Sequence, residues 1–433
     1  MIWNREMECA DRNTMRALQL EKLKKTVKHE YENVAPYRKK MDEAGVKPDD
    51  IKTLDDIRRL PFTQKEDLAA NYPTGLFAKP MHEIVRIQAS SGTTGKPKIA
   101  GYTRNDLDMW GECVARSLTM AGADKDSIVH VSYGYGLFTG GLGAHIGAET
   151  IGATVIPMSS GNTQKQVMFL QDMKSTHLCC TPSYALTIAE AVAKAGIKPE
   201  ELALKAGVFG AEPWTQAMRD KIEAGLGIKA HDIYGLSEIM GPGVSTSCSE
   251  NNGMHIQEDY FYPEIIDPDT LEPVPDGEKG ELVITTLGKE GMPLIRYRTR
   301  DICYLMREKC ACGRTTVRMS RVFGRTDDML IIRGVNVFPS QVETVIAKFD
   351  KELTMNYKLY IGRENNTDTF ELAVELAEGL ALDDIGFVEM MRGRVEHALR
   401  DILGIGCKVR LLNEGTLPRS EGKAVRVEDT RKL

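Results

Sequence analysis

The stretch Ser90-Ser91-Gly92-Thr93-Thr94-Gly95-Lys96-Pro97-Lys98 places hydroxyls, glycines and two lysines in nine positions directly after a predicted strand. Small residues let backbone N–H groups approach phosphate oxygens, hydroxyls donate further hydrogen bonds, and lysine supplies positive charge. The stretch differs from a Walker loop, because two residues rather than four separate Gly92 from Gly95 and Pro97 follows Lys96. It therefore predicts a polyphosphate-binding loop of another kind, with a solvated polar turn as the alternative.

Short apolar runs alternate with helical patterns around this loop, from residue 84 to residue 243. A helix is predicted near 107–120, and strands are predicted at 84–88, 127–132, 153–157, 177–180 and 206–209. This alternation is typical of βαβ units, so we expect a mostly parallel sheet with helices on its faces. From about residue 250 to residue 326, turn signals such as Pro275-Asp276-Gly277 separate short strands, which indicates a β-rich subdomain.

The C-terminal part of the chain has a different pattern. Strands are predicted near 355–361 and 370–376, with helices near 340–349 and 384–403, which is typical of a compact α+β domain. At 433 residues the chain exceeds the size at which one hydrophobic core usually stops growing. We therefore expect an α/β fold with a large N-terminal domain, residues 1–326, a small α+β domain, residues 327–433, and a hinge at Asp327.

The composition indicates a globular protein, with 42% hydrophobic and 27% charged residues. A net charge of -6 argues against a general affinity for nucleic acid or anionic membranes, because both require a basic face. The N-terminal residues mix charges at once, and the sequence lacks the ~20 consecutive apolar residues that a membrane-spanning helix needs. We therefore expect a cytoplasmic protein.

Nine cysteines, an odd number, make a disulfide framework unexpected in a reducing compartment and direct attention to metal binding. Cys248 and His255 are separated by six residues, and Cys310 and Cys312 belong to a Cys-x-Cys-Gly turn in the same predicted β-rich region. Three thiolates and one imidazole suit tetrahedral Zn²⁺, so these residues predict a structural zinc site. Free buried cysteines are the alternative.

Five motifs in order resemble those of the adenylate-forming superfamily, which includes acyl-CoA synthetases, nonribosomal adenylation domains and luciferases. They are the loop at 90–98, then Tyr234-Gly235-Leu236-Ser237-Glu238, Tyr297-Arg298-Thr299-Arg300-Asp301, Gly324-Arg325-Thr326-Asp327-Asp328 and Pro418-Arg419-Ser420-Glu421-Gly422-Lys423. Within this superfamily the residues at 133–141, 209–214 and 333–339 resemble the phenylacetate-CoA ligase family. The resemblance implies the adenylate-forming enzyme fold.

The resemblance also assigns nucleotide-binding roles, each of which is chemically reasonable. Glu238 is expected to bind Mg²⁺ through its carboxylate, with a surface glutamate as the alternative. Asp301 is expected to hold the ribose hydroxyls, although pairing with a neighbouring arginine is also open. Tyr234 is expected to stack on adenine, with a core tyrosine as the alternative. Arg325 is expected to reach ribose or phosphate, with a salt bridge at the domain junction as the alternative. The rest of the predicted ATP/AMP site is Ser90, Ser91, Gly92, Thr93, Thr94, Gly95, Lys96, Gly210, Ala211, Glu212, Asp232, Ile233, Gly235 and Ser237.

The remaining predicted roles concern the acid, the thiol and the reaction. By the resemblance, Lys423 is the catalytic lysine, where its ammonium would offset charge in the transition state. Gly334 and Asn336 are expected on the CoA side. An aromatic-lined acyl pocket, which ordinary core packing would also explain, is expected from Tyr133, Tyr135, Gly136, Phe138 and Gly140.

The resemblance implies a function: an ATP-dependent acid-CoA ligase acting on phenylacetate or a related aryl or arylacetic acid. The product would be a thioester formed through acyl-AMP, with release of AMP and pyrophosphate. ATP, Mg²⁺ and CoA are the expected cofactors and co-substrates, and a homodimer is the expected assembly. An adenylyltransferase that stops at the adenylate or transfers AMP to a hydroxyl is one alternative, and a non-catalytic nucleotide sensor is another.

Overall fold

The computed structural model describes residues 1–90, 97–327, 330–333, 335–364, 367–418 and 425–431. The chain divides into two compact units. The first comprises Met1–Ala211 with Ile222–Arg321, and the second comprises Glu212–Lys221 with Val322–Leu433. The short segment at 212–221 belongs to the second unit although it lies within the sequence of the first.

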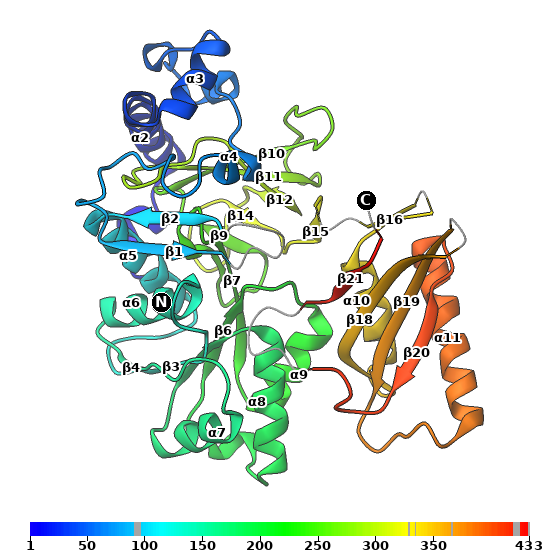
Figure 1. Cartoon of the computed structure of the whole chain (residues 1–433). Coiled ribbons are helices and arrows are strands. Elements are labelled where there is room, and N and C mark those ends of the chain that lie inside the picture. Colours follow the sequence, from blue (N-terminus) through cyan, green and yellow to red (C-terminus); the bar gives the residue numbers. More distant parts are fainter. Residues whose placement is uncertain (91–96, 328–329, 334, 365–366, 419–424, 432–433) are drawn as a thin grey trace. The chain divides into compact units, whose positions relative to one another are not determined.

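The first unit is built on a large mixed sheet with the strand order β13-β14-β9-β8-β7-β6-β5-β3-β4 (Figure 1). Its parallel strands are β3 (Ile128–Val131), β4 (Thr154–Ile156), β5 (His177–Cys180), β6 (Ala206–Gly210) and β7 (Lys229–Leu236). Strands β5 and β6 are buried along their whole length, as expected where a parallel sheet is covered on both faces. The predicted parallel α/β sheet is confirmed.

Helices precede and connect these strands. They are α5 (Arg104–Met120), α6 (Thr139–Thr150), α7 (Thr163–Asp172), α8 (Pro182–Lys194) and α9 (Gln216–Leu226). Helix α5 begins in a capping box in which the Thr103 hydroxyl accepts from the Asp106 N–H and the Asp106 carboxylate accepts from the Thr103 N–H. Helix α8 begins with Thr181 as its N-cap and Pro182 as its first residue, so local residues set both helix starts.

The residues predicted to form a β-rich subdomain divide between two sheets. After β8 (Gly241–Ser247), which precedes the predicted region, strands β9 (Met254–Ile256), β13 (Leu305–Met306) and β14 (Arg318–Met319) extend the large sheet in antiparallel fashion. Strands β10 (Phe261–Ile266), β11 (Gly280–Thr286) and β12 (Tyr297–Cys303) form a separate antiparallel sheet. The region is rich in strands, as predicted, but part of it completes the central sheet.

One strand prediction needs correction. The run at 84–88 was expected to belong to the βαβ sheet. Instead, β1 (Arg86–Ala89) pairs antiparallel with β2 (Ile99–Tyr102) in a small sheet of their own. This hairpin brings together the two chain segments that flank residues 91–96.

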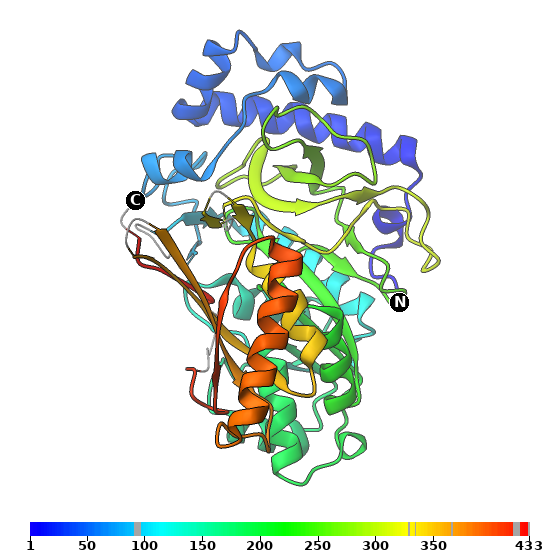
Figure 2. The same ribbon diagram turned by 90° about the vertical axis from the view of Figure 1, so that its right-hand side faces the viewer.

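The N-terminal part of the first unit is helical (Figure 2). Its helices are α1 (Arg5–Glu8), α2 (Arg12–Asn33), α3 (Ala35–Glu43) and the short α4 (Lys65–Ala70). Helix α2 is fastened near its start, where the Arg12 guanidinium binds both oxygens of the buried Glu258 carboxylate at 2.6 and 2.9 Å. None of the helices in the described part of the chain is long and apolar enough to cross a membrane.

The second unit contains a sheet in the order β20-β19-β18-β21, formed by β18 (Leu353–Glu364), β19 (Thr367–Leu376), β20 (Lys408–Leu412) and β21 (Val427–Asp429). Helices α10 (Pro339–Ile346) and α11 (Ile385–Leu403) share one apolar core with these strands. A hairpin of β16 (Leu330–Ile332) and β17 (Val335–Val337) follows β15 (Gly324–Arg325) along the chain. The predicted α+β character of this region is confirmed.

Candidate active site

The predicted nucleotide residues of the first unit gather where β6 and β7 end. Gly210 pairs with Ile233 across these strands, and Ser237 and Glu238 follow directly after β7. Gly210 and Gly235 must be glycines here, because a backbone carbonyl oxygen lies too close to each for a side chain. A Cβ on Gly210 would lie 2.1 Å from the Ile233 carbonyl oxygen, and one on Gly235 would lie 1.8 Å from that of Gly241. Open α/β sheets bind ligands at this carboxyl edge.

Glu238 is buried, with an exposed fraction of 3%, and neighbouring side chains contact it from several directions. The Tyr297 hydroxyl donates to its Oε1 at 2.6 Å, and the Lys98 ammonium lies 3.7 Å from the same atom. The Lys289 ammonium donates to the backbone carbonyls of Glu238 and Ile239 at 2.9 and 2.8 Å. A buried carboxylate in a fixed position is therefore present where the Mg²⁺ ligand is predicted.

Lys289 is a site residue that the sequence did not reveal. Burial lowers the pKa of its ammonium to about 8. Its charge also lies 4.8 Å from the centre of the Tyr102 ring, whose hydroxyl donates to the Ser237 carbonyl at 2.8 Å. In the sequence it follows a glycine and precedes a glutamate, a pattern that indicates a solvated turn. Lys98 and Tyr297, which lie within quoted motifs, could have been chosen from those motifs.

Asp301 and Tyr234 are brought into direct contact by β12 and β7. The Tyr234 hydroxyl donates to Asp301 Oδ2 at 2.6 Å, so the residues predicted for adenine and for ribose are adjacent. Nearby, the Arg298 guanidinium binds the buried Glu281 carboxylate, with its closest contact at 2.6 Å. Asp232 and Ile233 lie on the same strand as Tyr234, and Ala211 follows β6 with a left-handed φ of 73°.

The predicted phosphate loop is described only at its ends. Ser91, Gly92, Thr93, Thr94, Gly95 and Lys96 lie outside the described residues. Ser90 donates its N–H to the Lys98 carbonyl at 3.1 Å, and Ala89 donates to the Leu137 carbonyl at 2.8 Å. The β1–β2 hairpin thus anchors both ends of the loop and joins them to the segment that carries the predicted acyl pocket.

The predicted acyl-pocket residues lie at the start of α6 and just before it. The rings of Tyr133 and Phe138 are 6.4 Å apart, and a Cβ on Gly140 would lie 2.5 Å from the Phe138 ring. Tyr135 meets His145 edge to face, and its hydroxyl lies 3.2 Å from Nδ1 of that histidine. Burial raises the pKa of the Tyr135 hydroxyl. Gly136, with φ 114°, provides the turn between Tyr135 and Phe138.

Several predicted residues belong to the second unit. Glu212 lies in the segment at 212–221, and Arg325 forms an ion pair with Asp327 at 2.9 Å between Nε and Oδ1. Asn336 is in β17, where only its backbone is described. Gly334 and the predicted catalytic residue Lys423 lie outside the described residues. Their roles stay predictions.

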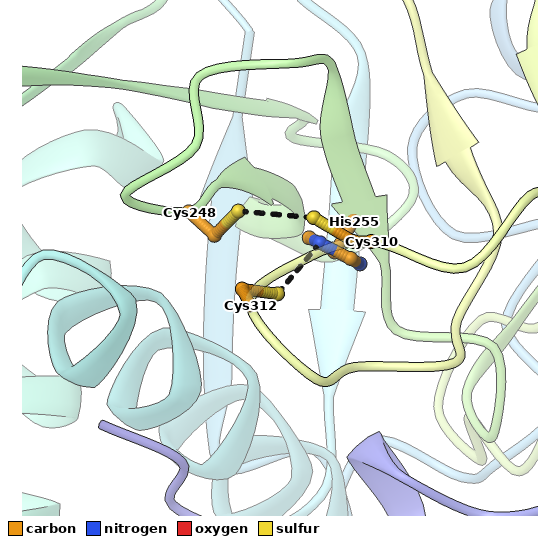
Figure 3. Close-up of side chains that lie close together, drawn as sticks. All are labelled: Cys248, His255, Cys310 and Cys312. Carbon is orange, nitrogen blue, oxygen red and sulfur yellow. Dashed lines mark hydrogen bonds between the residues drawn. The ribbon is translucent and has the colours of Figure 1, made fainter.

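The four predicted metal ligands converge in the first unit (Figure 3). Their ligand atoms all lie within 4.8 Å of one another. The Cys248 and Cys310 sulfurs are 3.7 Å apart, and the Cys312 sulfur is 3.4 Å from Nε2 of His255. The described residues thus place three thiol groups and one imidazole around one point.

The fold is that of the AMP-binding enzymes. A model of the AMP-binding enzyme family matches residues 11–288, and a model of the AMP-binding enzyme C-terminal domain matches residues 334–431. Phenylacetate-coenzyme A ligase of Thermus thermophilus is 51% identical over the whole of both chains. The Escherichia coli protein of the same name is also 51% identical, over 100% of this chain and 99% of its own. The chain therefore belongs to the phenylacetate-coenzyme A ligase family.

Solved structures agree with this assignment. A 2-hydroxyisobutyryl-CoA ligase in the postadenylation state, in complex with 2-HIB-AMP, matches with a TM-score of 0.91 and 30% identity. The match covers 99% of this chain and 92% of that one. The same ligase is known with 2-HIB-AMP and CoA in the thioesterification state, with a TM-score of 0.74, 30% identity and the same coverage. The predicted adenylate-forming fold is confirmed.

Proposed function

We propose that this chain joins phenylacetate, or a closely related aryl or arylacetic acid, to CoA at the expense of ATP. The proposal rests on one observation above all. Glu238 and Asp301, each held by a tyrosine hydroxyl at 2.6 Å, lie in one unit with an aromatic cluster around Tyr133 and Phe138. The full-length identity to phenylacetate-coenzyme A ligases supports the choice of acid and acceptor.

In the first half-reaction, an oxygen of the substrate carboxylate attacks the α-phosphorus of ATP, and pyrophosphate leaves. The hydroxyl groups of ribose would be held by Asp301, and the adenine ring would stack on Tyr234. Glu238, a buried carboxylate with hard oxygen donors, fits Mg²⁺, which when bound neutralises charge on the phosphate oxygens. Lys423 would donate to the oxygens at the reacting centre.

In the second half-reaction, the CoA thiolate attacks the acyl carbon and AMP leaves. We assign Asp327 as the hinge of a rotation between the two steps. The rotation would take Lys423 away from the reacting centre after the first step and bring Gly334 and Asn336 to the CoA side for the second. Asp327 suits this role because it lies between the short strands β15 and β16, a few residues after the second unit starts at Val322, and a hinge needs only a few residues to change φ and ψ. The two complexes of the related 2-hydroxyisobutyryl-CoA ligase support a two-state cycle.

A panel of acids tests this proposal. The chain is incubated with ATP and Mg²⁺ and with aryl, arylacetic or short aliphatic acids, and pyrophosphate and thioester are measured with and without CoA. Phenylacetate is expected to give both products in the presence of CoA. Pyrophosphate release that never leads to a thioester would overturn the ligase assignment. Light scattering of the same preparation tests the homodimer, which is also part of the proposal.

Asp301→Asn is expected to weaken AMP binding by about 10- to 100-fold, because a hydrogen bond to a charged acceptor contributes about 1.5–3 kcal/mol. Titration calorimetry with AMP measures the effect. Tyr234→Phe is the matched control, because it removes the hydroxyl that donates to Asp301 at 2.6 Å and keeps the ring. Its loss should be several-fold smaller. Equal AMP affinity in wild type and Asp301→Asn would contradict the ribose role.

Gly140→Ala is expected to reduce kcat/KM for phenylacetate by about tenfold or more, the scale of one methylene in a fitted pocket. The new Cβ would lie 2.5 Å from the Phe138 ring and 3.1 Å from Tyr133, so both rings must shift. Activity with acetate, which is smaller, should fall less. Gly393→Ala is the matched control, because its Cβ would meet nothing within 4 Å. Equal losses for the two acids would argue that these rings are only core.

A further inference from the structure

Two distances within the cluster formed by Cys248, His255, Cys310 and Cys312 suit a metal site. A tetrahedral zinc ion with Zn–S of about 2.3 Å and Zn–N of about 2.0–2.1 Å places ligand sulfurs about 3.8 Å apart and sulfur and nitrogen about 3.6 Å apart. The observed Cys248–Cys310 sulfur distance is 3.7 Å, and the Cys312 sulfur to His255 Nε2 distance is 3.4 Å. Both distances match edges of one ligand tetrahedron.

The outer contacts of the cluster orient its ligands. The other ring nitrogen of His255, Nδ1, lies 2.9 Å from the Thr316 hydroxyl, which leaves Nε2 directed at the cluster. The Arg314 guanidinium lies 3.8 Å from the Cys312 sulfur, where its charge would offset the excess negative charge that three thiolates would place around a divalent ion. Gly313, with φ 90°, closes the turn through its N–H to the Cys310 carbonyl at 3.1 Å.

The cluster also has a route for a metal ion. Cys248, His255 and Cys310 are buried, whereas Cys312 is partly exposed. Cys312 lines a cavity of about 580 Å³ together with Arg314, Lys205 and Lys229. An enclosed ligand set with one accessible sulfur meets the requirements for a metal site: four ligands, satisfied outer contacts and an entry path.

The position of the cluster indicates a structural rather than a catalytic ion. Cys248 follows β8, which runs antiparallel to β7, so it lies toward the beginning of β7, whereas Tyr234 and Glu238 lie at its end. A set of four protein ligands leaves no open position for a substrate, as in structural zinc sites.

The loop between β13 and β14 carries Cys310 and Cys312, and it holds the N-terminal segment. Thr315 donates its N–H to the Glu8 carbonyl at 3.0 Å and its hydroxyl to the Ala10 carbonyl at 2.6 Å. Arg314 in the same loop forms an ion pair with the buried Glu8 carboxylate and donates to the Met1 carbonyl at 2.6 Å. Any ion that orders this loop therefore also orders the first residues of the chain.

We propose that Cys248, His255, Cys310 and Cys312 bind one Zn²⁺ ion in tetrahedral coordination, and that this ion fastens the β13–β14 loop and, through it, residues 1–10. Thiolate and imidazole donors in this number favour zinc over the harder Mg²⁺ and Ca²⁺ ions. The site is independent of the proposed ligase reaction, so either can fail without the other.

The zinc content of the full-length chain, purified without a metal-binding tag after growth with added zinc, tests the site directly. Mass spectrometry of the metal is expected to find about one zinc per chain, falling below about one-tenth in Cys310→Ser and His255→Ala. Cys303→Ser is the matched control, because Cys303 is also a buried thiol of this region but is not part of the cluster. It should keep its zinc.

Two measurements on the wild type avoid variants that fail to fold. X-ray absorption at the zinc edge should show sulfur at about 2.3 Å and nitrogen at about 2.0–2.1 Å. After zinc is displaced with a mercurial and a chelator, amide exchange at Glu8 and Cys9 should rise by about tenfold or more, with no change in α11.

The proposal is overturned by a folded wild type that stays zinc-free after growth with zinc, by an oxygen-only coordination shell, or by full zinc in Cys310→Ser. A Cys248–Cys310 disulfide in zinc-free protein would overturn it as well. Unchanged exchange at Glu8 and Cys9 after zinc removal would overturn the fastening of the N-terminal segment.

Discussion

Glu238→Gln is expected to lower the rate of acyl-adenylate formation by about 10²–10³, because a metal ion on the transferred phosphate contributes several kcal/mol to the transition state. The amide keeps the size of the side chain and can still accept from the Tyr297 hydroxyl, which donates to Glu238 at 2.6 Å. The substitution therefore removes charge with little change in shape. The rate is measured by pyrophosphate exchange with phenylacetate over a series of Mg²⁺ concentrations.

Tyr297→Phe separates the metal role of Glu238 from its packing. It removes one hydrogen bond to a charged group but leaves the carboxylate, so the rate should fall by only about tenfold, the scale of one such bond. If Glu238→Gln keeps wild-type exchange at low Mg²⁺, the carboxylate is not a metal ligand. A loss in Glu238→Gln accompanied by unfolding, seen by circular dichroism, would instead show that its buried contacts are structural.

Lys423→Ala is expected to reduce acyl-adenylate formation by about 10²–10³, the scale of losing one preorganised donor to developing charge. Thioester formation from supplied phenylacetyl-adenylate and CoA should be nearly unchanged, because the lysine is assigned to the first half-reaction only. Single-turnover assays of each half-reaction measure the two rates separately.

Lys351→Ala is the matched control for this lysine, because Lys351 is an exposed lysine of the same unit outside the C-terminal motif. It should retain both half-reactions. Equal losses in the two half-reactions of Lys423→Ala would reject the assignment, because a lysine that acts in adenylation alone cannot slow the transfer from a preformed adenylate.

Local sequence patterns predicted the parallel part of the fold well. The runs at 127–132, 153–157, 177–180 and 206–209 all became strands of the central sheet. Strands buried on both faces need continuous apolar residues, and helices between them begin at short-range caps such as Thr181 before α8. Both signals lie within a few residues of one another, so a single sequence can show them.

The antiparallel parts were less accessible to prediction. Strand β1 left the expected sheet to pair with β2, and β9, β13 and β14 joined the central sheet rather than a separate subdomain. Short strands with similar composition can pair with several partners. The choice among them depends on long-range packing that no local pattern records.

The site shows the same division. Glu238, Asp301 and the four proposed zinc ligands could be suggested from motifs and residue types, although Cys248 and Cys310 lie 62 residues apart. Their convergence required the fold. No sequence pattern indicated Lys289, because lysine side chains usually lie in water. The packing of the folded chain buries it against the Glu238 carbonyl.

The residues alone were thus sufficient to predict the chemistry proposed for this chain: a hydroxyl- and glycine-rich loop at 90–98, carboxylates in two motifs, and sulfur and imidazole donors. These depend on side-chain types and short spacings, which the sequence contains in full. The meeting of Tyr234 with Asp301, of Tyr297 with Glu238, and of the Cys310 turn with the N-terminal segment came from the tertiary structure. Each contact joins residues far apart in the chain, and the packing of the sheets decides which distant residues meet.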